Sequence, residues 1–339
     1  MAVVRSLKID FDALESILIV KPSSLGDIVH TLPLLSILRQ AAPQAKIDWL
    51  VNAVWSPLLE GQQLLDGLVE YPRQEFRGAG GPIRFGRWAR KQRERRPDLA
   101  LDVQGLLRSA VAARACKSRR IVGYSDAREG ANLLHHDVVD VSLKRSPHAV
   151  DRYLTFCQAT GLEIPDSLDF QLPAGDSVDC DLPESFILLH PFSRGKGKSL
   201  TNSQVQALVA AWGDRPVVVV GKADGAGLQL PDNALNLLNQ TTIAQLIWLL
   251  RQASFVVSVD SGPMHLAAAA TGNLLSIHTW TDPLKVGPYR PEAWVWNGGE
   301  IHQMSEHRED PQLRNSDVES FEDNAIQPLA DFVAIQFDQ

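Results

Sequence analysis

One carboxylate in this chain stands where open α/β sheets carry out acid–base chemistry. Asp27 lies in the run Val20-Lys-Pro-Ser-Ser-Leu-Gly-Asp-Ile-Val-His-Thr-Leu-Pro33, after an apolar segment at 17–20 and before an apolar-periodic segment that ends near Leu38. This pattern predicts a buried strand, a tight turn and a helix start, and ligands of such sheets bind beyond the carboxyl ends of the strands. Asp27 is therefore a candidate general base and equally a candidate helix cap, and His30, about one turn further on, is the alternative base.

A second concentration of polar residues follows a strand-like segment in the other half of the chain. The run from Phe255 to Ala270 (FVVSVDSGPMHLAAAA) predicts a strand that ends on Asp260 and a helix capped by Ser261 or Gly262. Such a helix N-terminus exposes amides that favour a phosphate group. The alternative is a well-capped crossover helix that binds nothing, with His265 as a semi-buried histidine.

Three more loops in this half follow predicted strands. The loop at 190–198 combines glycines with arginine and lysine, which offers donors and positive charge to a diphosphate without bulk. The loop at 221–225 can reach a ribose, and the loop at 281–283 adds hydroxyl and carboxylate groups. Together with the Asp260 loop they predict a nucleotide-diphosphate pocket.

Alternating strand and helix patterns position these loops. Strands are predicted in the first half at 17–20, 46–51, 99–103 and 120–123, and in the second half at 186–190, 217–220, 255–260 and 274–278. This alternation predicts parallel sheets with helices on both faces. Pro33 leaves two possibilities open, a kinked helix or a helix that starts only near Thr31.

The same pattern divides the chain into parts. We expect a Rossmann-like domain at 1–165, a linker at 166–184 rich in Pro, Gly and Asp, a second Rossmann-like domain at 185–325, and a final helix within 326–339. No G-x-G-x-x-G follows a predicted strand and no G-x-x-x-x-G-K-[ST] is present, which disfavours dinucleotide oxidoreductases and P-loop enzymes.

The composition is that of an ordinary globular protein. The chain has 339 residues, of which 45% are hydrophobic and 22% charged, and no apolar run approaches the roughly 20 residues of a membrane span. We read no export signal at the N-terminus, and three cysteines without ligand spacing fit a reduced cytoplasm. A net charge of −7 argues against nucleic acid as a partner.

One stretch departs from this overall negative charge. Between Arg73 and Arg96 the chain carries nine arginines and lysines, with Phe76, Phe85 and Trp88 interleaved. The stretch is either a solvated helix face or a docking surface for an anionic partner, such as a phosphorylated glycolipid at a membrane surface.

Taken together, these runs resemble the ADP-heptose:lipopolysaccharide heptosyltransferases of glycosyltransferase family 9. The resemblance extends from about residue 16 to residue 285, and the run around Asp260 is common to the whole family. The matching segments are Val20-Lys-Pro-Ser-Ser-Leu-Gly-Asp27, His30-Thr-Leu-Pro33, Asp102-Val-Gln-Gly-Leu-Leu-Arg-Ser109, Ala127-Arg-Glu129, His148-Ala-Val-Asp-Arg-Tyr153, Ser258-Val-Asp-Ser-Gly-Pro-Met-His265 and Thr281-Asp-Pro283.

The resemblance implies a GT-B fold and assigns roles to individual positions. In that fold two Rossmann-like domains face each other across a cleft, and the final helix crosses back onto the first domain. Asp27 matches the catalytic base and Lys198 the phosphate-binding lysine. The family usually has a tryptophan just after that lysine, where this chain has Leu200, so Lys196 is a second candidate for the role. The family's ribose-binding acid is not at its usual place after the strand that ends in glycine, and Asp224 is the nearest candidate. The donor-binding candidates are Ser193, Arg194, Lys196, Lys198, Asp224, Asp260, Ser261, Gly262, His265 and Thr281, and the acceptor-binding candidates are Ser24, Gly26, His30, Gln104, Arg108 and Arg128.

The implied activity is an inverting, metal-independent transfer of a heptose from ADP-heptose to a Kdo-containing glycolipid of the lipid A type. It would take place in the cytoplasm, with peripheral attachment to the inner face of the inner membrane. We expect no cofactor and no metal, because Asp10-Phe-Asp12 and Asp179-Cys-Asp181 end no apolar strand and His135-His136-Asp137 reads as a solvated turn. The rival interpretations are another family 9 donor or acceptor, a nucleotide-sugar epimerase and a non-catalytic nucleotide-binding protein.

Overall fold

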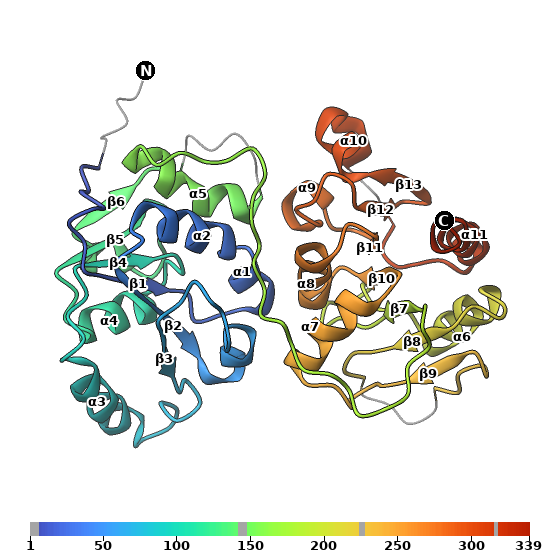
Figure 1. Cartoon of the computed structure of the whole chain (residues 1–339), viewed down its shortest axis with the longest axis horizontal. Helices are drawn as coiled ribbons and strands as arrows, with labels where there is room; N and C mark the ends of the chain where they lie inside the picture. The colour runs from blue at the N-terminus through green and yellow to red at the C-terminus, as the bar shows by residue number, and fades with distance from the viewer. Residues whose placement is uncertain (1–6, 142–147, 224–227, 315–317) are drawn as a thin grey trace. The chain divides into compact units, whose positions relative to one another are not determined.

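The chain folds into two compact α/β units. The computed structural model describes residues 7–141, 148–223, 228–314 and 318–339 (Figure 1). Unit 1 is Met1–Pro173 and unit 2 is Ala174–Gln339, so the division falls inside the segment 166–184 that the sequence predicts to be a linker. Each unit has its own sheet and its own core.

The sheet of unit 1 has six parallel strands in the order β3-β2-β1-β4-β5-β6. This is the strand order of doubly wound nucleotide-binding sheets. The strands are β1 (Ser16–Val20), β2 (Lys46–Asn52), β3 (Gly67–Tyr71), β4 (Leu99–Asp102), β5 (Arg120–Tyr124) and β6 (Asp137–Val139).

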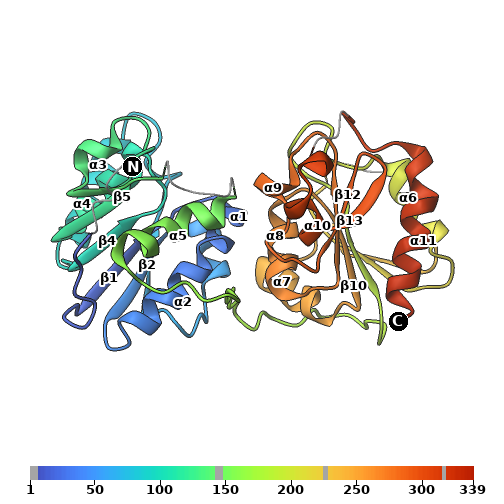
Figure 2. The same ribbon diagram turned by 90° about the horizontal axis from the view of Figure 1, so that it is seen from above.

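Helices cover both faces of this sheet. Helices α3 and α4 lie on one face, where Trp88 and Ala112 pack against Leu18 and Val20 of β1, while α1, α2 and α5 lie on the other (Figures 1 and 2). The helices are α1 (Leu25–Val29), α2 (Leu32–Ala41), α3 (Gly81–Gln92), α4 (Leu107–Ala115) and α5 (Ala149–Thr160), with the 3-10 helices η1 (Ala53–Leu58) and η2 (Ala131–Leu134).

The apolar segment after Asp27 forms two helices and not one. Helix α1 ends at Val29, and α2 begins at Leu32 with Pro33 in its first turn, where a missing N–H costs no helical hydrogen bond. The second of the two possibilities left open by Pro33 is therefore the observed one. Asp27 consequently belongs to a helix of its own at the end of β1.

The sheet of unit 2 has seven strands in the order β13-β12-β11-β10-β7-β8-β9, and only β13 runs antiparallel to its neighbour. Its strands are β7 (Ile187–His190), β8 (Val217–Val219), β9 (Ala234–Asn236), β10 (Phe255–Val259), β11 (Leu274–His278), β12 (Trp294–Asn297) and β13 (Glu300–Gln303). Its helices are α6 (Asn202–Ala211), α7 (Ile243–Gln252), α8 (Gly262–Ala270), α9 (Pro283–Val286), α10 (Met304–Glu309) and α11 (Ile326–Phe337), with the 3-10 helices η3 (Pro311–Arg314) and η4 (Asp323–Ala325).

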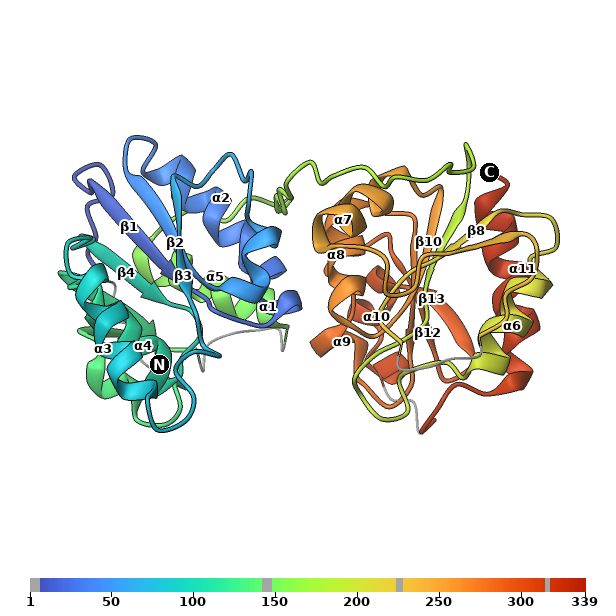
Figure 3. The same ribbon diagram turned by 90° about the horizontal axis from the view of Figure 1, so that it is seen from below.

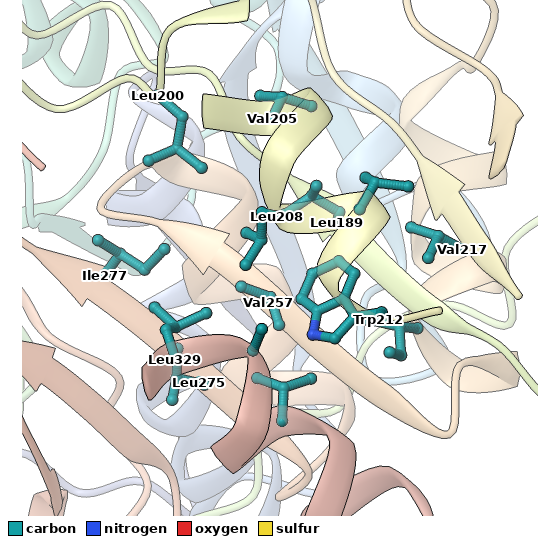
Figure 4. Close-up of a cluster of buried hydrophobic side chains, with 14 of the residues drawn as sticks. Leu189, Leu200, Val205, Leu208, Trp212, Val217, Val257, Leu275, Ile277 and Leu329 are labelled. Carbon is teal, nitrogen blue, oxygen red and sulfur yellow. The ribbon is translucent and has the colours of Figure 1, made fainter. Parts of the chain in front are cut away.

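Helices α6 and α11 cover one face of the second sheet, and α7, α8 and α9 cover the other (Figure 3). The core beneath α6 and α11 joins side chains of β7, β8, β10 and β11 to Leu208, Trp212 and Leu329 (Figure 4). The predicted fold class of two doubly wound, Rossmann-like α/β units is confirmed.

The last helix packs on the second sheet. Helix α11 lies beside α6 within unit 2, and its expected return onto the first domain stays a prediction. Its residues Leu329, Ala330 and Val333 are fully buried and belong to the core of the second sheet. The apolar stripe of this helix covers a sheet face that α6 alone would leave open to water.

Candidate functional site

Asp27 sits at the first turn of α1 and does act as a helix cap. The backbone N–H of Ser24 donates to Oδ2 of Asp27 at 3.0 Å, and the Ser24 hydroxyl donates to the same oxygen at 2.9 Å. This reach-back contact satisfies a helix-terminal donor. The cap interpretation is thus correct, but it occupies only one oxygen of the carboxylate.

The other oxygen faces two side chains to which the sequence analysis assigned no role. The Tyr153 hydroxyl donates to Oδ1 of Asp27 at 2.9 Å, and the ammonium of Lys21 lies 3.6 Å from Oδ1. Lys21 Nζ also donates to the Tyr153 hydroxyl at 2.7 Å and to the Val103 carbonyl at 3.4 Å. The sequence held one indication of this role, because Lys21 directly follows a strand whose residues are almost all buried.

The charges of this cluster are fixed at neutral pH. Burial opposes ionisation of Asp27, but the Lys21 ammonium and the hydrogen bonds from Ser24 and Tyr153 outweigh it, so the pKa of the carboxyl lies below its ordinary value. Burial lowers the pKa of Lys21 to about 8, against the pull of Asp27. Burial and the adjacent carboxylate raise the pKa of Tyr153 well above its ordinary value. Asp27 is therefore a carboxylate, Lys21 an ammonium and Tyr153 a neutral phenol.

Two of the acceptor-binding candidates beyond α1 are tied to the same edge of the first sheet. The backbone N–H of Ser23 donates to Gln104 Oε1 at 3.3 Å, which joins the loop after β4 to the loop after β1. Arg128, exposed on the loop after β5, donates its backbone N–H to the Gly105 carbonyl at 2.9 Å. Arg108 is half-buried in the first turn of α4. Ser24, the N-cap of α1, and Gly26 both precede Asp27 at the start of that helix.

His30, the alternative base, points inward. It is 7% exposed, and its ring packs edge-on against the ring of His148 with centroids 4.9 Å apart. The side chain of Asp27 is by contrast 37% exposed. The geometry favours Asp27 over His30 as the group that can meet a substrate hydroxyl.

A buried pair holds the Gln104 loop. Asp102 Oδ1 accepts from the backbone N–H groups of Gln104 at 3.2 Å and Gly105 at 3.1 Å, while Oδ2 is 2.9 Å from His135 Nε2. The sequence analysis placed His135 in a solvated turn, and this was wrong, because its side chain has no exposed surface. Gly123 makes room for it, since a Cβ there would overlap the imidazole ring.

In unit 2, Lys198 and Asp260 form an ion pair at the carboxyl edge of the sheet. Lys198 Nζ lies 2.6 Å from Asp260 Oδ2, and the Thr281 hydroxyl donates to the same oxygen at 2.8 Å. The Trp280 ring lies beside the ammonium, with its centroid 4.9 Å from Nζ. The family that the sequence resembles has a tryptophan just after this lysine, where this chain has Leu200. Trp280, on the loop after β11, instead brings an aromatic ring to the ammonium.

Lys198 and Lys196, the two candidates for the phosphate-binding lysine, differ in their burial and in their partners. The Lys196 side chain is exposed, and its carbonyl accepts from Trp280 Nε1 at 3.0 Å, whereas Lys198 is half-buried with Asp260. Lys198 is the better placed of the two to present a fixed charge. Arg194 is exposed on the same loop, which Ser193 and Ser199 brace through a bond of 2.8 Å from the Ser193 N–H to the Ser199 hydroxyl.

The pKa values of Asp260 and His278 show which neighbour of Asp260 carries the positive charge at neutral pH. Burial favours the neutral acid of Asp260, but His278, Lys198 and Thr281 outweigh it, so the pKa of Asp260 lies below its ordinary value. Burial also lowers the pKa of His278 to about 4, which leaves that imidazole neutral at pH 7. Lys198 is therefore the cation that keeps Asp260 ionised.

The remaining donor-side candidates belong to the start of α8. The Ser261 hydroxyl accepts from the Met264 N–H at 3.4 Å and caps the helix, Gly262 is its first residue, and His265 is 9% exposed. Asp224 lies outside the described residues.

Within the described part of the chain no group of three or more His, Cys, Asp or Glu side chains could hold a metal ion. No helix there is long and apolar enough to cross a bilayer.

A family model and individual relatives of known name both match this chain. The model of glycosyltransferase family 9 (heptosyltransferase) matches residues 85–315. Lipopolysaccharide heptosyltransferase 1 of Salmonella typhimurium is 27% identical over 80% of this chain and 91% of its own length. The Pseudomonas aeruginosa protein of the same name is 29% identical over 80% of this chain and 81% of its own.

Solved structures show the same fold. The Escherichia coli ADP-heptose lipopolysaccharide heptosyltransferase II superimposes with a TM-score of 0.74 at 20% identity, over 96% of this chain and all of the other. The E. coli heptosyltransferase WaaC with ADP-2-deoxy-2-fluoro heptose superimposes with a TM-score of 0.68 at 23% identity, over 83% of this chain and 92% of that one.

Proposed function

Because this chain belongs to glycosyltransferase family 9, and is therefore a glycosyltransferase, we propose that it moves a heptose from ADP-heptose to the Kdo-containing inner core of lipopolysaccharide. The donor and acceptor classes follow from the names of its relatives and of their complexes. The observation that carries the proposal is Asp27, an ionised and partly exposed carboxylate at the edge of the first sheet.

On the donor side, the proposed diphosphate site combines the α8 N-terminus with Lys198 and Arg194. The amides at a helix start and the fixed ammonium of Lys198 suit a leaving group whose negative charge grows as the glycosidic bond breaks. Asp260 and Thr281 hold that ammonium in one place. In this proposal these groups stabilise the departing ADP, which is why we propose a metal-independent reaction.

On the acceptor side, Asp27 takes the proton of the attacking hydroxyl. The hydroxyl oxygen forms the new bond to the anomeric carbon from the face opposite the diphosphate, and ADP leaves with the electron pair of the broken bond. Configuration at the anomeric carbon is inverted. A general base contributes about 10²–10⁴-fold to such a rate.

The lowered pKa of Asp27 bears on the timing of the proton transfer. A carboxylate that is stabilised by a cation and three hydrogen-bond donors is a weak base. It can still accept the proton once the bond to ADP has largely broken, because the attacking hydroxyl is then far more acidic than in the free sugar. We therefore propose late proton transfer.

We propose that α3 is the surface that meets the membrane bearing the acceptor, on the cytoplasmic face of the inner membrane. Arg84, Arg87, Arg90 and Lys91 on this helix are exposed, and Ile83 beside them is 69% exposed. Trp88 faces inward against β1 and β3, which leaves the basic side outward. Such a face fits anionic lipid headgroups.

The test is direct transfer. The purified protein is incubated with ADP-heptose and a Kdo-bearing lipid A, and the lipid is followed by mass spectrometry. Gain of one heptosyl unit supports the proposal. Intact ADP binding without any gain would instead favour a non-catalytic nucleotide-binding protein, and an acceptor-independent change in ADP-heptose would favour an epimerase.

A further inference from the structure

Lys21 is an ammonium group almost entirely removed from water. Its residue is 2% exposed, at the end of β1, and the backbone around it is held by β2 and β4. A buried charge is costly unless it is paired and hydrogen-bonded, and an apolar side chain of the same length would serve the packing at least as well. The position therefore calls for an explanation beyond folding.

The direction of the hydrogen bonds around Lys21 is determined by chemistry. An ammonium can only donate, so in the 2.7 Å contact the Tyr153 oxygen must accept from Lys21 Nζ. The phenol has a single proton, and with its oxygen turned toward Lys21 it donates that proton to Asp27 Oδ1 at 2.9 Å. The chain of bonds thus runs one way, from ammonium to phenol to carboxylate.

The carboxylate itself is nearly saturated. Each of its oxygens has about two lone-pair directions. Oδ2 uses both of them for the N–H and the hydroxyl of Ser24, and Oδ1 uses one for Tyr153. Lys21 Nζ, at 3.6 Å from Oδ1, is too distant to take the other by a hydrogen bond. One acceptor direction is left, on Oδ1.

We propose that Lys21 is a positioning residue that acts through the Tyr153 hydroxyl to orient Asp27 and to reserve the remaining lone pair of Oδ1 for the incoming sugar hydroxyl. This inference rests on the proposed function, because it gives Asp27 the role of base. Neither Lys21 nor Tyr153 needs to touch the substrate in this arrangement. Without Tyr153 the carboxylate would be held only through the Ser24 bonds to Oδ2, and without Lys21 the Tyr153 hydroxyl would no longer be kept turned toward Oδ1.

The charge state of Lys21 should control this arrangement. The charged and titratable groups that act on it are Asp27 on α1, Arg152 and Tyr153 on α5 and Asp102 on β4. With a pKa of about 8, the ammonium loses its proton in mildly alkaline solution. A neutral amine can accept a hydrogen bond, so the Tyr153 hydroxyl is then able to turn away from Asp27. Activity should decline above about pH 8.

The experiment compares Lys21→Met and Tyr153→Phe with Lys8→Met, a matched change at an exposed lysine. Transfer is measured from pH 5.5 to 9.5, with folding checked by near-ultraviolet circular dichroism. We expect kcat to fall by about 10- to 100-fold in Lys21→Met and in Tyr153→Phe, a part of the general-base contribution, with the KM for ADP-heptose unchanged. The alkaline limb near pH 8 should be present in the wild type and in Lys8→Met and absent in Lys21→Met.

A second readout keeps this inference separate from the proposed function. The carboxyl pKa of Asp27 is followed by ¹³C NMR in the substrate-free protein, with the signal assigned through Asp27→Asn. We expect that pKa to rise in Lys21→Met and in Tyr153→Phe but not in Lys8→Met. A wild type without transferase activity would remove the proposed function alone. Unchanged kcat and alkaline limb, or an unchanged Asp27 pKa in the folded variants, would overturn the role of Lys21.

Discussion

At the scale of single residues, the two candidate carboxylates of this chain are ionised by different means. Asp27 is stabilised by helix-start donors, a phenol and a buried lysine, and Asp260 by Lys198 and a threonine hydroxyl. Asp27 keeps one acceptor direction open, whereas Asp260 is 6% exposed and serves to fix a cation. The first is suited to receive a proton and the second to hold a charge against a phosphate.

The separation of Lys198 from Lys196 can be measured. Lys198→Ala should weaken ADP binding by about 10-fold or more, because a charge-assisted hydrogen bond contributes about 1.5–3 kcal/mol. Lys196→Ala, two residues away on the same loop and exposed, should have a much smaller effect. Isothermal titration with ADP gives both values, and equal losses in the two variants would be evidence against Lys198 as the phosphate-binding lysine.

Stability should fall in mild acid because two buried histidines are kept neutral. Burial lowers the pKa of His190 and of His278 to about 4, so between pH 6.5 and 4 the unfolded chain binds more protons than the folded one. Stability is therefore full above pH 6.5 and is lost as the pH falls toward 4, by up to about 3 kcal/mol for each histidine.

Thermal melts across this range test that expectation. His278→Asn should flatten part of the acid loss, whereas His302→Asn should not. His302 has the opposite behaviour. Burial lowers its pKa, but Glu306 and Glu300 together outweigh burial, so the pKa of His302 lies above its ordinary value. Its contribution is present below pH 6.5 and is lost as the pH rises through the raised value. A melting temperature independent of pH between 6.5 and 4.5 would contradict the assignment.

At the scale of elements, the sequence predicted most strands inside the two sheets and missed those at the sheet edges. The segments of β1 and β10 are nearly continuous apolar runs, which is typical of buried parallel strands. The missed strands are the edge strands β3, β6, β9 and β13 and the neighbour of β13, β12. Strands β6 and β9 have three residues each, with too few apolar positions to give a period. Their strand state depends on pairing with neighbours that the local sequence does not reveal.

Helix α11 offers a test of its packing on the second sheet. Leu329 is 0% exposed in the core of unit 2, so Leu329→Ala should lower the free energy of unfolding by about 2–5 kcal/mol. Ile335 on the same helix is 60% exposed, and Ile335→Ala should change it by less than about 0.5 kcal/mol. Urea denaturation measures both, and similar small changes would mean that α11 does not pack on the second sheet.

Helix α3 offers a test of membrane docking. Arg87 and Arg90 are exposed, and each basic side chain near an anionic bilayer contributes about 1 kcal/mol. The double variant Arg87→Glu/Arg90→Glu should therefore bind vesicles of phosphatidylcholine with 30% phosphatidylglycerol at least about 10-fold more weakly than the wild type.

The matched control reverses two exposed lysines elsewhere, Lys117→Glu/Lys222→Glu, and should leave most of the binding intact. Added salt should weaken the wild type toward the variant, because screening shortens the reach of the charges. Cosedimentation gives the affinities. If both double variants bind alike, net charge and not α3 governs attachment.

At the scale of the whole molecule, the chain consists of two units that each bring polar loops to the carboxyl edge of a parallel sheet. That much could be predicted from sequence, because strand ends and the residues that follow them are local features. The contacts of Lys21 with Tyr153, 132 residues apart, and of Lys198 with Asp260, 62 residues apart, depend on the fold. The same holds for Trp280, which no motif marked, and for His135, which local sequence made appear solvated.

The central claim is that the carboxylate in unit 1 performs base catalysis for a donor whose proposed phosphate site lies in unit 2. Asp27→Asn keeps the size of the side chain and removes its ability to take a proton. The protein is compared with the wild type for heptosyl transfer to a Kdo-bearing lipid A and for ADP affinity. We predict a loss of about 10²–10⁴-fold in kcat with ADP affinity unchanged. Transfer by Asp27→Asn at the wild-type rate would contradict the account.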